Sequence, residues 1–302
     1  MSISDVEIFP AEVQEARLLI NRRLDEYTRF DANDSGEACP EQLREAIRYS
    51  LLSNGKRLRP LLVLAASHIC GGEMQNALGA ACAVEMIHTY SLIHDDLPAM
   101  DDDDLRRGKP TCHVQFDEAT AILAGDGLLT MAFEVMARDT PPQVAAKCCQ
   151  MLAAAAGPKQ LVGGQVDDLA AQFTPPDAYQ LQRIHSRKTG ALLTVALELG
   201  GTIAGGTPEM LQALGDYGSD IGLAFQIVDD LLDVQGEEAQ LGKRTGKDSE
   251  QGKLTYPLVM GYQASKELAH AKVESAISAL QVFGAAADPL VLFANFVVDR
   301  TR

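Results

Sequence analysis

Apolar residues recur at the three- and four-residue spacing of an α-helix along most of the chain, and segments that alternate apolar and polar residues are hard to find. The apolar run at 80–93 and the longer pattern at 208–234 are the clearest examples. Paired prolines and glycines, as at Pro141-Pro142 and Gly163-Gly164, end or bend the helices between them. The sequence therefore predicts an all-α protein of roughly ten helices.

The chain shows no sign of division into separate domains. No segment repeats with a period of about 20 to 50 residues, and no Pro/Ser-rich linker separates two halves. We therefore expect residues 1–302 to form a single domain. The two most polar stretches without an apolar stripe, 31–37 and 235–248, are predicted loops.

Charge and composition narrow the class of protein. The chain has 26 basic and 42 acidic side chains, a net charge of −16, which argues against nonspecific nucleic-acid binding. No apolar run approaches the roughly 20 residues that span a bilayer, and the first ten residues carry Asp5 and Glu7 rather than a basic segment. We expect a cytoplasmic protein without an integral membrane segment. Its six cysteines have no metal-type spacing and are expected to be reduced.

An acidic cluster follows the apolar run at 80–93. Six aspartates occupy ten positions, two at 95–96 and four at 101–104. The first two stand at the C-terminus of a buried helix, where the helix dipole disfavours negative charge, so we expect a cationic partner. Pro98 disfavours helix at the residue before it. We therefore expect the helix to unwind there and a turn to bring Asp101 back beside Asp95.

A second acidic cluster lies in the long predicted helix, where positions 229, 230 and 233 are aspartate. Gln226, Asp229 and Asp233 follow one another at i, i+3 and i+7, so one amide and two carboxylates share a face. That face adjoins an apolar stripe made of Ile221, Phe225, Val228 and Leu232.

Runs of aspartate are usually solvated surface. Both clusters here interrupt apolar helices, where desolvated carboxylates are costly unless they are paired or bind a cation. Hard oxygen ligands without neighbouring cysteine suit Mg²⁺, which binds through one or two carboxylates together with substrate phosphates. A calcium site is the rival, but neither cluster has the EF-hand pattern of glycine at position six and glutamate at position twelve.

Compact basic motifs are scattered through this acidic chain. They are Gly-Lys-Arg-Leu-Arg-Pro at 55–60, Leu-Arg-Arg-Gly at 105–108, Arg-Lys-Thr-Gly at 187–190, and Gly-Lys-Arg-Thr-Gly-Lys-Asp at 242–248. Each alone would be a helix end or a surface patch. Combined with two clusters suited to Mg²⁺, they indicate a diphosphate site in which the metal bridges phosphate oxygens to aspartate and Arg/Lys neutralise the rest.

With these motifs in this order, the chain resembles the trans-isoprenyl diphosphate synthase (polyprenyl synthetase) family, most closely its bacterial short-chain farnesyl diphosphate synthases. The first aspartate motif is Asp95-Asp96-x4-Asp101, and the second is Gln226-x2-Asp229-Asp230-x2-Asp233. The resemblance covers about residues 40–265, and the combination of motifs is far more specific than one Asp-Asp-x-x-Asp.

The resemblance implies the isoprenoid synthase fold, a helical bundle around a deep central cavity, usually in a homodimer. The reaction would join an allylic diphosphate head to tail with isopentenyl diphosphate, using Mg²⁺ at three ions per active site. The metal would be held by Asp95 and Asp101, with Asp229 opposite. The catalytic residues would be Asp95, Asp101, Arg106, Lys188, Asp229 and Lys243.

The same resemblance implies two diphosphate sites. The allylic diphosphate would be bound by Arg106, Lys188, Thr189, Gln226 and Lys243. The diphosphate of isopentenyl diphosphate would be bound by Lys56, Arg59, His88 and Arg107. Helix geometry agrees at one point, because His88 and Asp95 are seven residues, about two turns, apart and so share a face.

Product length should depend on what blocks the cavity below the first motif. Tyr90 lies five residues before Asp95, about 7.5 Å toward the helix N-terminus. In similar enzymes a bulky residue here, with the two extra residues inside the motif, accompanies a fifteen-carbon product. The resemblance thus implies a (2E,6E)-farnesyl diphosphate synthase, or geranyltranstransferase. The other interpretation of Tyr90 is an ordinary core tyrosine.

Three alternatives stay open. A geranyl or geranylgeranyl diphosphate synthase would carry the same motifs. A class I terpene cyclase normally has an Asn/Ser/Glu metal motif on its second helix, whereas 229–233 is aspartate-rich here and the pair Lys56 and Arg59 is added. A noncatalytic partner subunit should have lost one aspartate motif, and both are complete.

Overall fold

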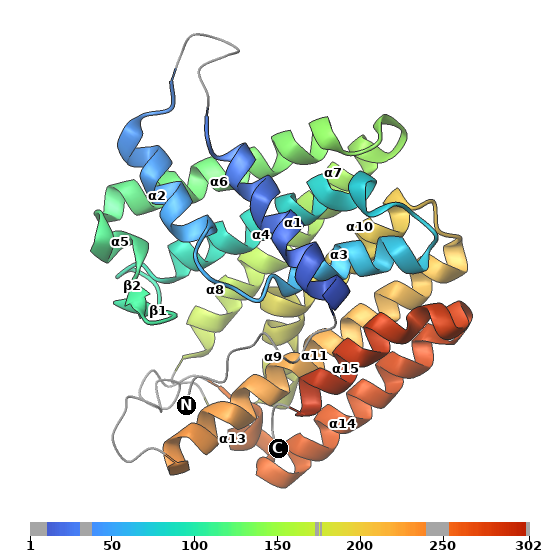
Figure 1. Cartoon of the computed structure of the whole chain (residues 1–302). Coiled ribbons are helices and arrows are strands. Elements are labelled where there is room, and N and C mark those ends of the chain that lie inside the picture. The colour runs from blue at the N-terminus through green and yellow to red at the C-terminus, as the bar shows by residue number, and fades with distance from the viewer. Residues whose placement is uncertain (1–10, 31–37, 173–174, 176, 240–253, 300–302) are drawn as a thin grey trace. The chain divides into compact units, whose positions relative to one another are not determined.

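The computed structural model describes residues 11–30, 38–172, 175, 177–239 and 254–299 (Figure 1). Nearly all of these residues are helical, which confirms the all-α prediction; the strands described are β1 (Leu105–Arg106) and β2 (Lys109–Pro110), an antiparallel pair. The chain divides into two compact units, unit 1 (1–64 and 73–149) and unit 2 (65–72 and 150–302). That residues 1–302 form a single domain stays a prediction.

Unit 1 is built around a helix that is buried along most of its length. Its helices are α1 (Ala11–Tyr27), α2 (Glu41–Leu51), the start of α3 (Leu58–Ile69), α4 (Met74–Asp95), α5 (Cys112–Gln115), α6 (Glu118–Asp139) and the start of α7 (Pro142–Ala156). The central helix, α4, packs against α6 and also contacts α1 and α2. Because α4 is covered from several directions, its sequence is apolar almost all round rather than on one stripe.

Unit 2 contains the other helices that the structure describes. They are α8 (Leu161–Ala171), α9 (Ala178–His185), a π-helical segment (Ser186–Gly190), α10 (Ala191–Ile203), α11 (Pro208–Ala239), α13 (Tyr256–Met260), α14 (Tyr262–Ala279), a 3-10 segment (Leu280–Ala287) and α15 (Asp288–Asp299). The long helix α11 lies beside α14 and α15 in Figure 1 and also packs against α10. The hydroxyl of the fully buried Tyr217 on α11 donates to the carbonyl of Leu290 at 2.8 Å and so fixes α15 to α11.

The apolar stripe predicted on α11 is only partly right. Ile221 and Val228 are fully buried, but Phe225 and Leu232 are partly exposed while Leu231 is fully buried. Helices cover α11 on more than one side, so its buried sector is wider than one stripe. The predicted loop at 235–248 was also wrong at its start, because α11 continues to Ala239; residues 240–248, like 31–37, lie outside the described residues.

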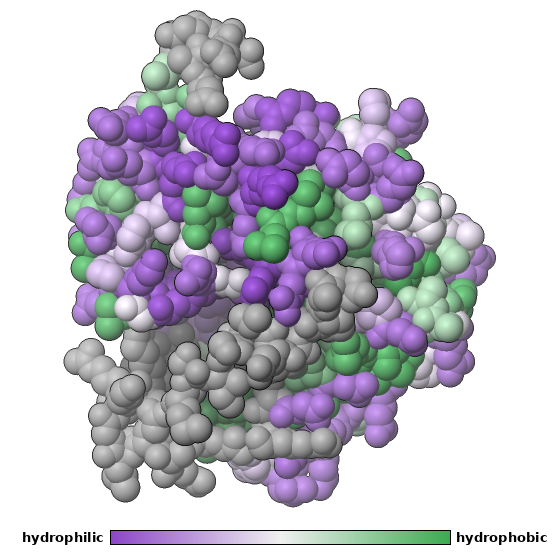
Figure 2. Space-filling model, in the orientation of Figure 1, coloured by the Kyte–Doolittle hydropathy of each residue, from purple (hydrophilic) through white to green (hydrophobic). Residues whose placement is uncertain are grey.

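In the part of the chain that the structure describes, two helical stretches, 118–139 and 262–299, are long and apolar enough to cross a bilayer, a test that core helices also pass. One side of α6 is buried against α4. The second stretch is broken at Gly284, whose φ of 56° and ψ of −136° are not helical. Two stretches that pass by length and composition alone are weak evidence for a membrane span. The face in Figure 2 is mostly hydrophilic where it is coloured, with apolar side chains in small groups.

Candidate active site

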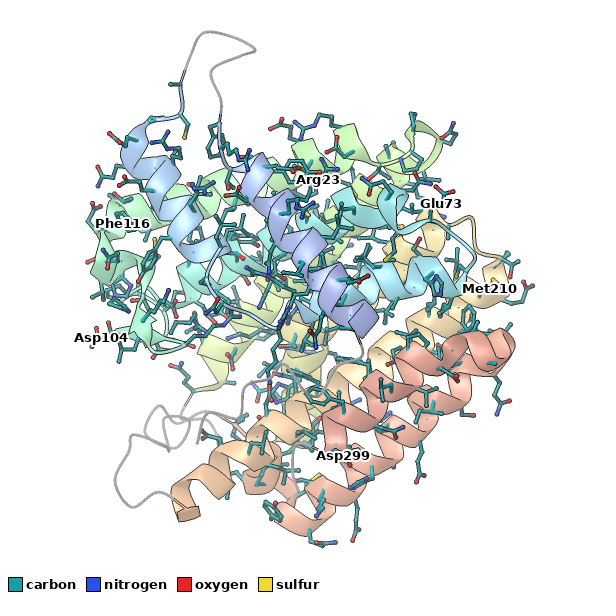
Figure 3. All side chains as sticks on the ribbon, viewed as in Figure 1. Arg23, Glu73, Asp104, Phe116, Met210 and Asp299 are labelled. Atoms are coloured by element: carbon teal, nitrogen blue, oxygen red, sulfur yellow. The ribbon has the colours of Figure 1, made fainter. Side chains whose placement is uncertain are left out.

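The first aspartate motif closes a turn at the C-terminus of α4. The helix ends at Asp95, and the amide of Asp101 donates to the carbonyl of Asp95 at 2.9 Å. The amide of Asp103 reaches the carbonyl of Asp96 at 3.2 Å, and Asp102 adopts a left-handed φ of 51° within the turn. The expected unwinding near Pro98 is thus confirmed, and Asp101 returns beside Asp95. Asp104 lies at the exposed end of the motif (Figure 3).

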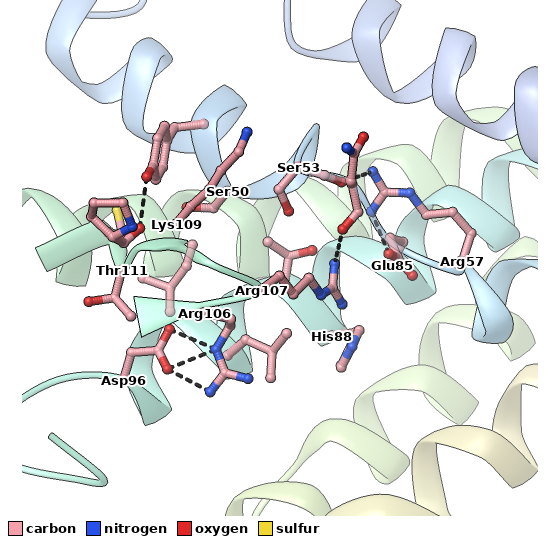
Figure 4. A pocket seen from close by; sticks show the side chains of 17 residues that line it. Ser50, Ser53, Arg57, Glu85, His88, Asp96, Arg106, Arg107, Lys109 and Thr111 are labelled. Atoms are coloured by element: carbon pink, nitrogen blue, oxygen red, sulfur yellow. Dashed lines mark hydrogen bonds and ion pairs between the residues drawn. The ribbon is translucent and has the colours of Figure 1, made fainter. Parts of the chain in front are cut away.

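The cation expected at this helix end is Arg106 on β1. Its Nε and Nη2 atoms donate to the Asp96 carboxylate at 2.6–2.9 Å, as Figure 4 shows. Burial raises the pKa of Asp96, and the bonds from Arg106 oppose that shift. A forked guanidinium–carboxylate pair fixes direction as well as charge. Asp96 therefore orients Arg106, a role that the sequence had not assigned.

The hairpin turn after Arg106 sends the next arginine elsewhere. β1 and β2 pair Arg106 with Lys109, and the two residues between them, Arg107 and Gly108, have φ values of 54° and 75°. Two successive positive φ angles define a tight type I′ hairpin turn, which favours glycine at its second position. Arg107 Nη1 then donates to the carbonyl of Asn54 at 2.9 Å.

A group of arginines surrounds His88 on α4. Nη1 of Arg59 lies 3.3 Å from Nε2 of His88. Burial lowers the pKa of His88 well below its usual value, and the charges of Arg59 and Arg107, followed by Arg106 and Arg57, lower it further. The imidazole is therefore neutral at pH 7 and offers one donor and one acceptor. Positive charge gathered around a neutral ring suits an anion.

A cavity of about 100 Å³ in unit 1 brings three of the predicted site residues together, His88, Arg106 and Arg107 (Figure 4). Lys56, in the loop between α2 and α3, is partly buried and does not line this cavity. A larger cavity of about 700 Å³ lies in unit 2, beside Gly190 and Thr194. Among the residues described, no predicted site residue lines that second cavity.

Tyr90 is a buried residue of α4 with 6% of its surface exposed. Its ring meets that of His94 edge to face, with centroids 5.8 Å apart. His94 in turn lies 3.0 Å through Nε2 from the carbonyl of Ile122 on α6. The position fits both an ordinary core tyrosine and a residue that limits the depth of a cavity.

In unit 2 the π-helical segment carries the predicted Lys188 and Thr189. Nζ of Lys188 donates to the carboxylate of Asp168 at 2.8 Å, and the hydroxyl of Thr189 donates to the amide oxygen of Gln226 at 3.2 Å. Single π turns inside helices are frequent at functional sites. Gly164 passes against the backbone of Lys188 so closely that a Cβ atom would clash. Gly164, in the Gly163-Gly164 pair, thus allows close contact between α8 and this segment.

The second aspartate motif divides its carboxylates between two faces of α11. Asp229 and Asp233 are partly exposed together with Gln226, as their spacing predicts. Asp230 is buried; its carboxylate accepts from the amide of Tyr256 at 2.9 Å and lies 3.6 Å from Nε2 of His185. A residue one position along a helix points about 100° away, so this burial follows from helix geometry.

Among the residues described, few side chains could bind Mg²⁺ directly. Within the described ranges, no group of three or more His, Cys, Asp and Glu side chains could hold a metal ion. The backbone turn brings residues Asp95 and Asp101 together, and carboxylate oxygens are the donor type that fits Mg²⁺ completed by substrate phosphate oxygens. Asp95 and Asp229 belong to different units, so their facing each other stays a prediction, and Lys243 lies outside the described residues.

Known proteins are similar to this chain in sequence and fold. The family model described as polyprenyl synthetase matches residues 40–283. Geranylgeranyl pyrophosphate synthase 11, chloroplastic, of Arabidopsis thaliana is 49% identical over 269 residues, 86% of this chain and 75% of that protein. Farnesyl diphosphate synthase of Haemophilus influenzae is 45% identical over 277 residues, 90% of this chain and 92% of that protein. The apo crystal structure of an FPP/GFPP synthase from Zymomonas mobilis superposes with a TM-score of 0.83 at 39% identity, covering 95% of this chain and 97% of that one.

The chain belongs to the polyprenyl synthetase family. It is a prenyltransferase of isoprenoid biosynthesis, a short-chain prenyl diphosphate synthase with the all-α fold of its structural neighbours, in a family that uses Mg²⁺. The relatives carry both farnesyl and geranylgeranyl names, so membership does not select the product. They also include chloroplastic proteins, and a cytoplasmic location stays a prediction.

Proposed function

We propose that this protein is a (2E,6E)-farnesyl diphosphate synthase, which adds isopentenyl diphosphate to dimethylallyl diphosphate and then to geranyl diphosphate. The observation that carries the proposal is the closed first motif, in which Asp101 returns to Asp95 beside an oriented Arg106. Two carboxylates for metal, beside a fixed guanidinium for phosphate, are what ionisation of an allylic diphosphate requires.

The allylic site is assembled from both aspartate motifs. Asp95, Asp101 and Asp229 would hold Mg²⁺, three ions per active site, and the bound metal would neutralise charge on the departing diphosphate. Arg106 would grip that diphosphate from the direction set by Asp96. The other residues that would bind the allylic diphosphate are Lys188, Thr189, Gln226 and Lys243. The bond between Thr189 and Gln226 supports this grouping.

The isopentenyl diphosphate site would use Lys56, Arg59, His88 and Arg107. The depressed pKa of His88 supports this assignment, because a neutral imidazole donates to phosphate without adding another charge to an already crowded group of arginines. An arriving diphosphate would relieve the repulsion among Arg57, Arg59 and Arg107, and Arg107 would exchange its bond to the Asn54 carbonyl for one to phosphate.

Condensation then needs a proton acceptor and a dry site. The double bond of isopentenyl diphosphate attacks the allylic cation, and a proton leaves to form the new double bond. Asp96 does not serve as the base because Arg106 holds both of its oxygens. We assign the proton to the departed diphosphate. Apolar helices around the reacting carbons would exclude the water that quenches a carbocation.

The buried Tyr90 supports a fifteen-carbon product, since its ring fills the interior five residues before Asp95. A geranylgeranyl product is the second candidate, favoured by 49% identity to the Arabidopsis relative named for it. We also propose a homodimer, supported by the family resemblance.

The proposal is tested with purified protein, Mg²⁺, isopentenyl diphosphate and either dimethylallyl or geranyl diphosphate. Products are dephosphorylated and sized by chromatography. Farnesol from both starters is the expected result. Geranylgeraniol as the main product would replace the farnesyl assignment, terpene hydrocarbons would indicate a cyclase, and no product from an intact preparation would indicate a noncatalytic subunit.

A further inference from the structure

Arg57 stands between Lys56 and Arg59 but takes no part in the proposed diphosphate contacts. Its side chain is only 3% exposed. The guanidinium Nε donates to Oδ1 of Asn21 at 2.9 Å, and Nη1 donates to Oε1 of Glu85 at 2.7 Å. Arg57 and Glu85 line the same cavity as His88, and the guanidinium of Arg57 is held there by protein acceptors.

The remaining bonds of Arg57 hold the backbone of its own loop. Nη2 donates to the carbonyls of Leu51 at 2.8 Å and Ser53 at 2.9 Å. On the other side of the same loop, Arg107 donates to the carbonyl of Asn54. Segment 51–55, which leads directly to Lys56, is therefore fastened by two guanidinium groups.

Glu85 connects this loop to the helix that carries His88. It lies three residues before His88 on α4, so the two side chains share a face, and its carboxylate is 4% exposed. Figure 4 shows Arg57 and Glu85 joined by a dashed line, with His88 in the same pocket. The ion pair therefore fixes the distance between the loop with Lys56 and the helix position of His88.

Two features argue that this arrangement serves more than stability. Arg57 and Arg107 are two of the four non-glycine residues with left-handed φ among the residues described, at 53° and 54°. Such strain persists where surrounding contacts over-determine the backbone, and it is concentrated at functional sites. A buried ion pair is also a poor source of stability, because an apolar pair of similar volume often does as well.

We propose that Arg57 and Glu85 form a positioning pair for isopentenyl diphosphate, holding Lys56 and Arg59 in register with His88. The inference rests on the proposed function. It assigns to neither residue a contact with substrate. Loss of the pair would leave the allylic site in place and misplace the groups that bind the second diphosphate.

The test compares Glu85→Gln with the double variant Arg57→Met/Glu85→Met. Glu85→Gln keeps an oxygen acceptor and removes the charge. The double variant leaves no buried charge unpaired, but it also removes the bonds of Arg57 to Asn21 and to the carbonyls of Leu51 and Ser53, so its thermal unfolding is measured first to show that it folds. The control is Arg48→Met, which breaks the pair of Arg48 with Asp25 between α1 and α2. Each is assayed for KM of isopentenyl diphosphate, KM of geranyl diphosphate, binding of isopentenyl diphosphate by calorimetry, and thermal unfolding.

We expect the double variant to raise KM and Kd for isopentenyl diphosphate roughly ten- to a hundred-fold, since small misplacement of binding groups is costly. Glu85→Gln should give a smaller rise in the same two constants. In both variants KM for geranyl diphosphate should change less than about two-fold. The control Arg48→Met should leave KM for both substrates unchanged. An equal rise in both constants, or unchanged constants in a folded double variant, would overturn the positioning role. A wild type that neither binds nor consumes isopentenyl diphosphate would instead refute the proposed function, and the inference with it.

Discussion

Adjacent aspartates of the first motif are expected to respond differently to the same substitution. Asp95 is proposed to bind Mg²⁺, whereas both oxygens of Asp96 accept hydrogen bonds from Arg106. In Asp96→Asn one oxygen becomes an NH₂ group that faces the guanidinium, so the forked pair loses its charge and one of its acceptors. Arg106 then loses the direction that aims it at the allylic diphosphate.

The size of the effect follows from the burial of the pair. The Asp96 side chain is 4% exposed and that of Arg106 is 33% exposed. A hydrogen bond to a charged group contributes about 1.5–3 kcal/mol, and partial solvation of Arg106 reduces the loss to about 1–2 kcal/mol. At about 1.4 kcal/mol for each factor of ten, kcat/KM for the allylic diphosphate should fall roughly 5- to 30-fold.

The assay is steady-state turnover at varied Mg²⁺ for wild type, Asp95→Asn and Asp96→Asn. Asp95→Asn should raise the Mg²⁺ concentration that gives half-maximal activity, and Asp96→Asn should leave it unchanged at reduced kcat/KM. If Asp96→Asn shifts the Mg²⁺ requirement as far as Asp95→Asn does, Asp96 is a metal ligand and its pairing with Arg106 does not describe the working enzyme.

Three further changes test other parts of the site. Tyr90→Ala should lengthen the product, read by chromatography of the dephosphorylated chains; unchanged length would leave Tyr90 an ordinary core residue. Gly55→Ala places a Cβ 2.5 Å from Nη1 of Arg107 and should raise KM for isopentenyl diphosphate with a stability loss under about 1 kcal/mol, because only the end of a flexible side chain must move; an unchanged KM contradicts the role of Arg107. Because the pKa of His88 is lowered in the folded protein, its imidazole is protonated in the unfolded chain before it is protonated in the folded one as the pH falls through about 6.5. The free energy of unfolding is therefore highest above that pH and falls below it by up to about 1.4 kcal/mol per pH unit. Urea unfolding at pH 5.5 and 7.5 should show a smaller difference for His88→Gln, and equal differences would contradict the shift.

The sequence predicts local geometry well where a single residue dictates it. Pro98 indicates that α4 ends near it, and the turn back to Asp95 follows. The need for a cation at this helix end is also predictable from the dipole, but its identity is not, because Arg106 arrives through a hairpin whose pairing is not encoded in helical spacing.

Partners distant in sequence are the part that could not be predicted. Glu85 lies within an apolar helix, and the residues near it in sequence do not indicate that it pairs with an arginine 28 residues away. Asp168 and Lys188 are likewise joined only by folding. In α11 the helical period places Asp230 off the exposed face, yet its acceptance of a bond from Tyr256 depends on how the chain returns after the helix.

The hairpin turn consists of only two residues, Arg107 and Gly108, so its length is fixed by the pairing of Arg106 with Lys109. One strand position sends a guanidinium to Asp96, and the very next position sends another to Asn54. Adding or deleting a residue in this turn would change the direction of Arg107 relative to Arg106 and break its bond to Asn54. Length, more than composition, is therefore what natural or laboratory variants of this hairpin must preserve, and arginine content alone is a poor guide to whether a variant hairpin can work.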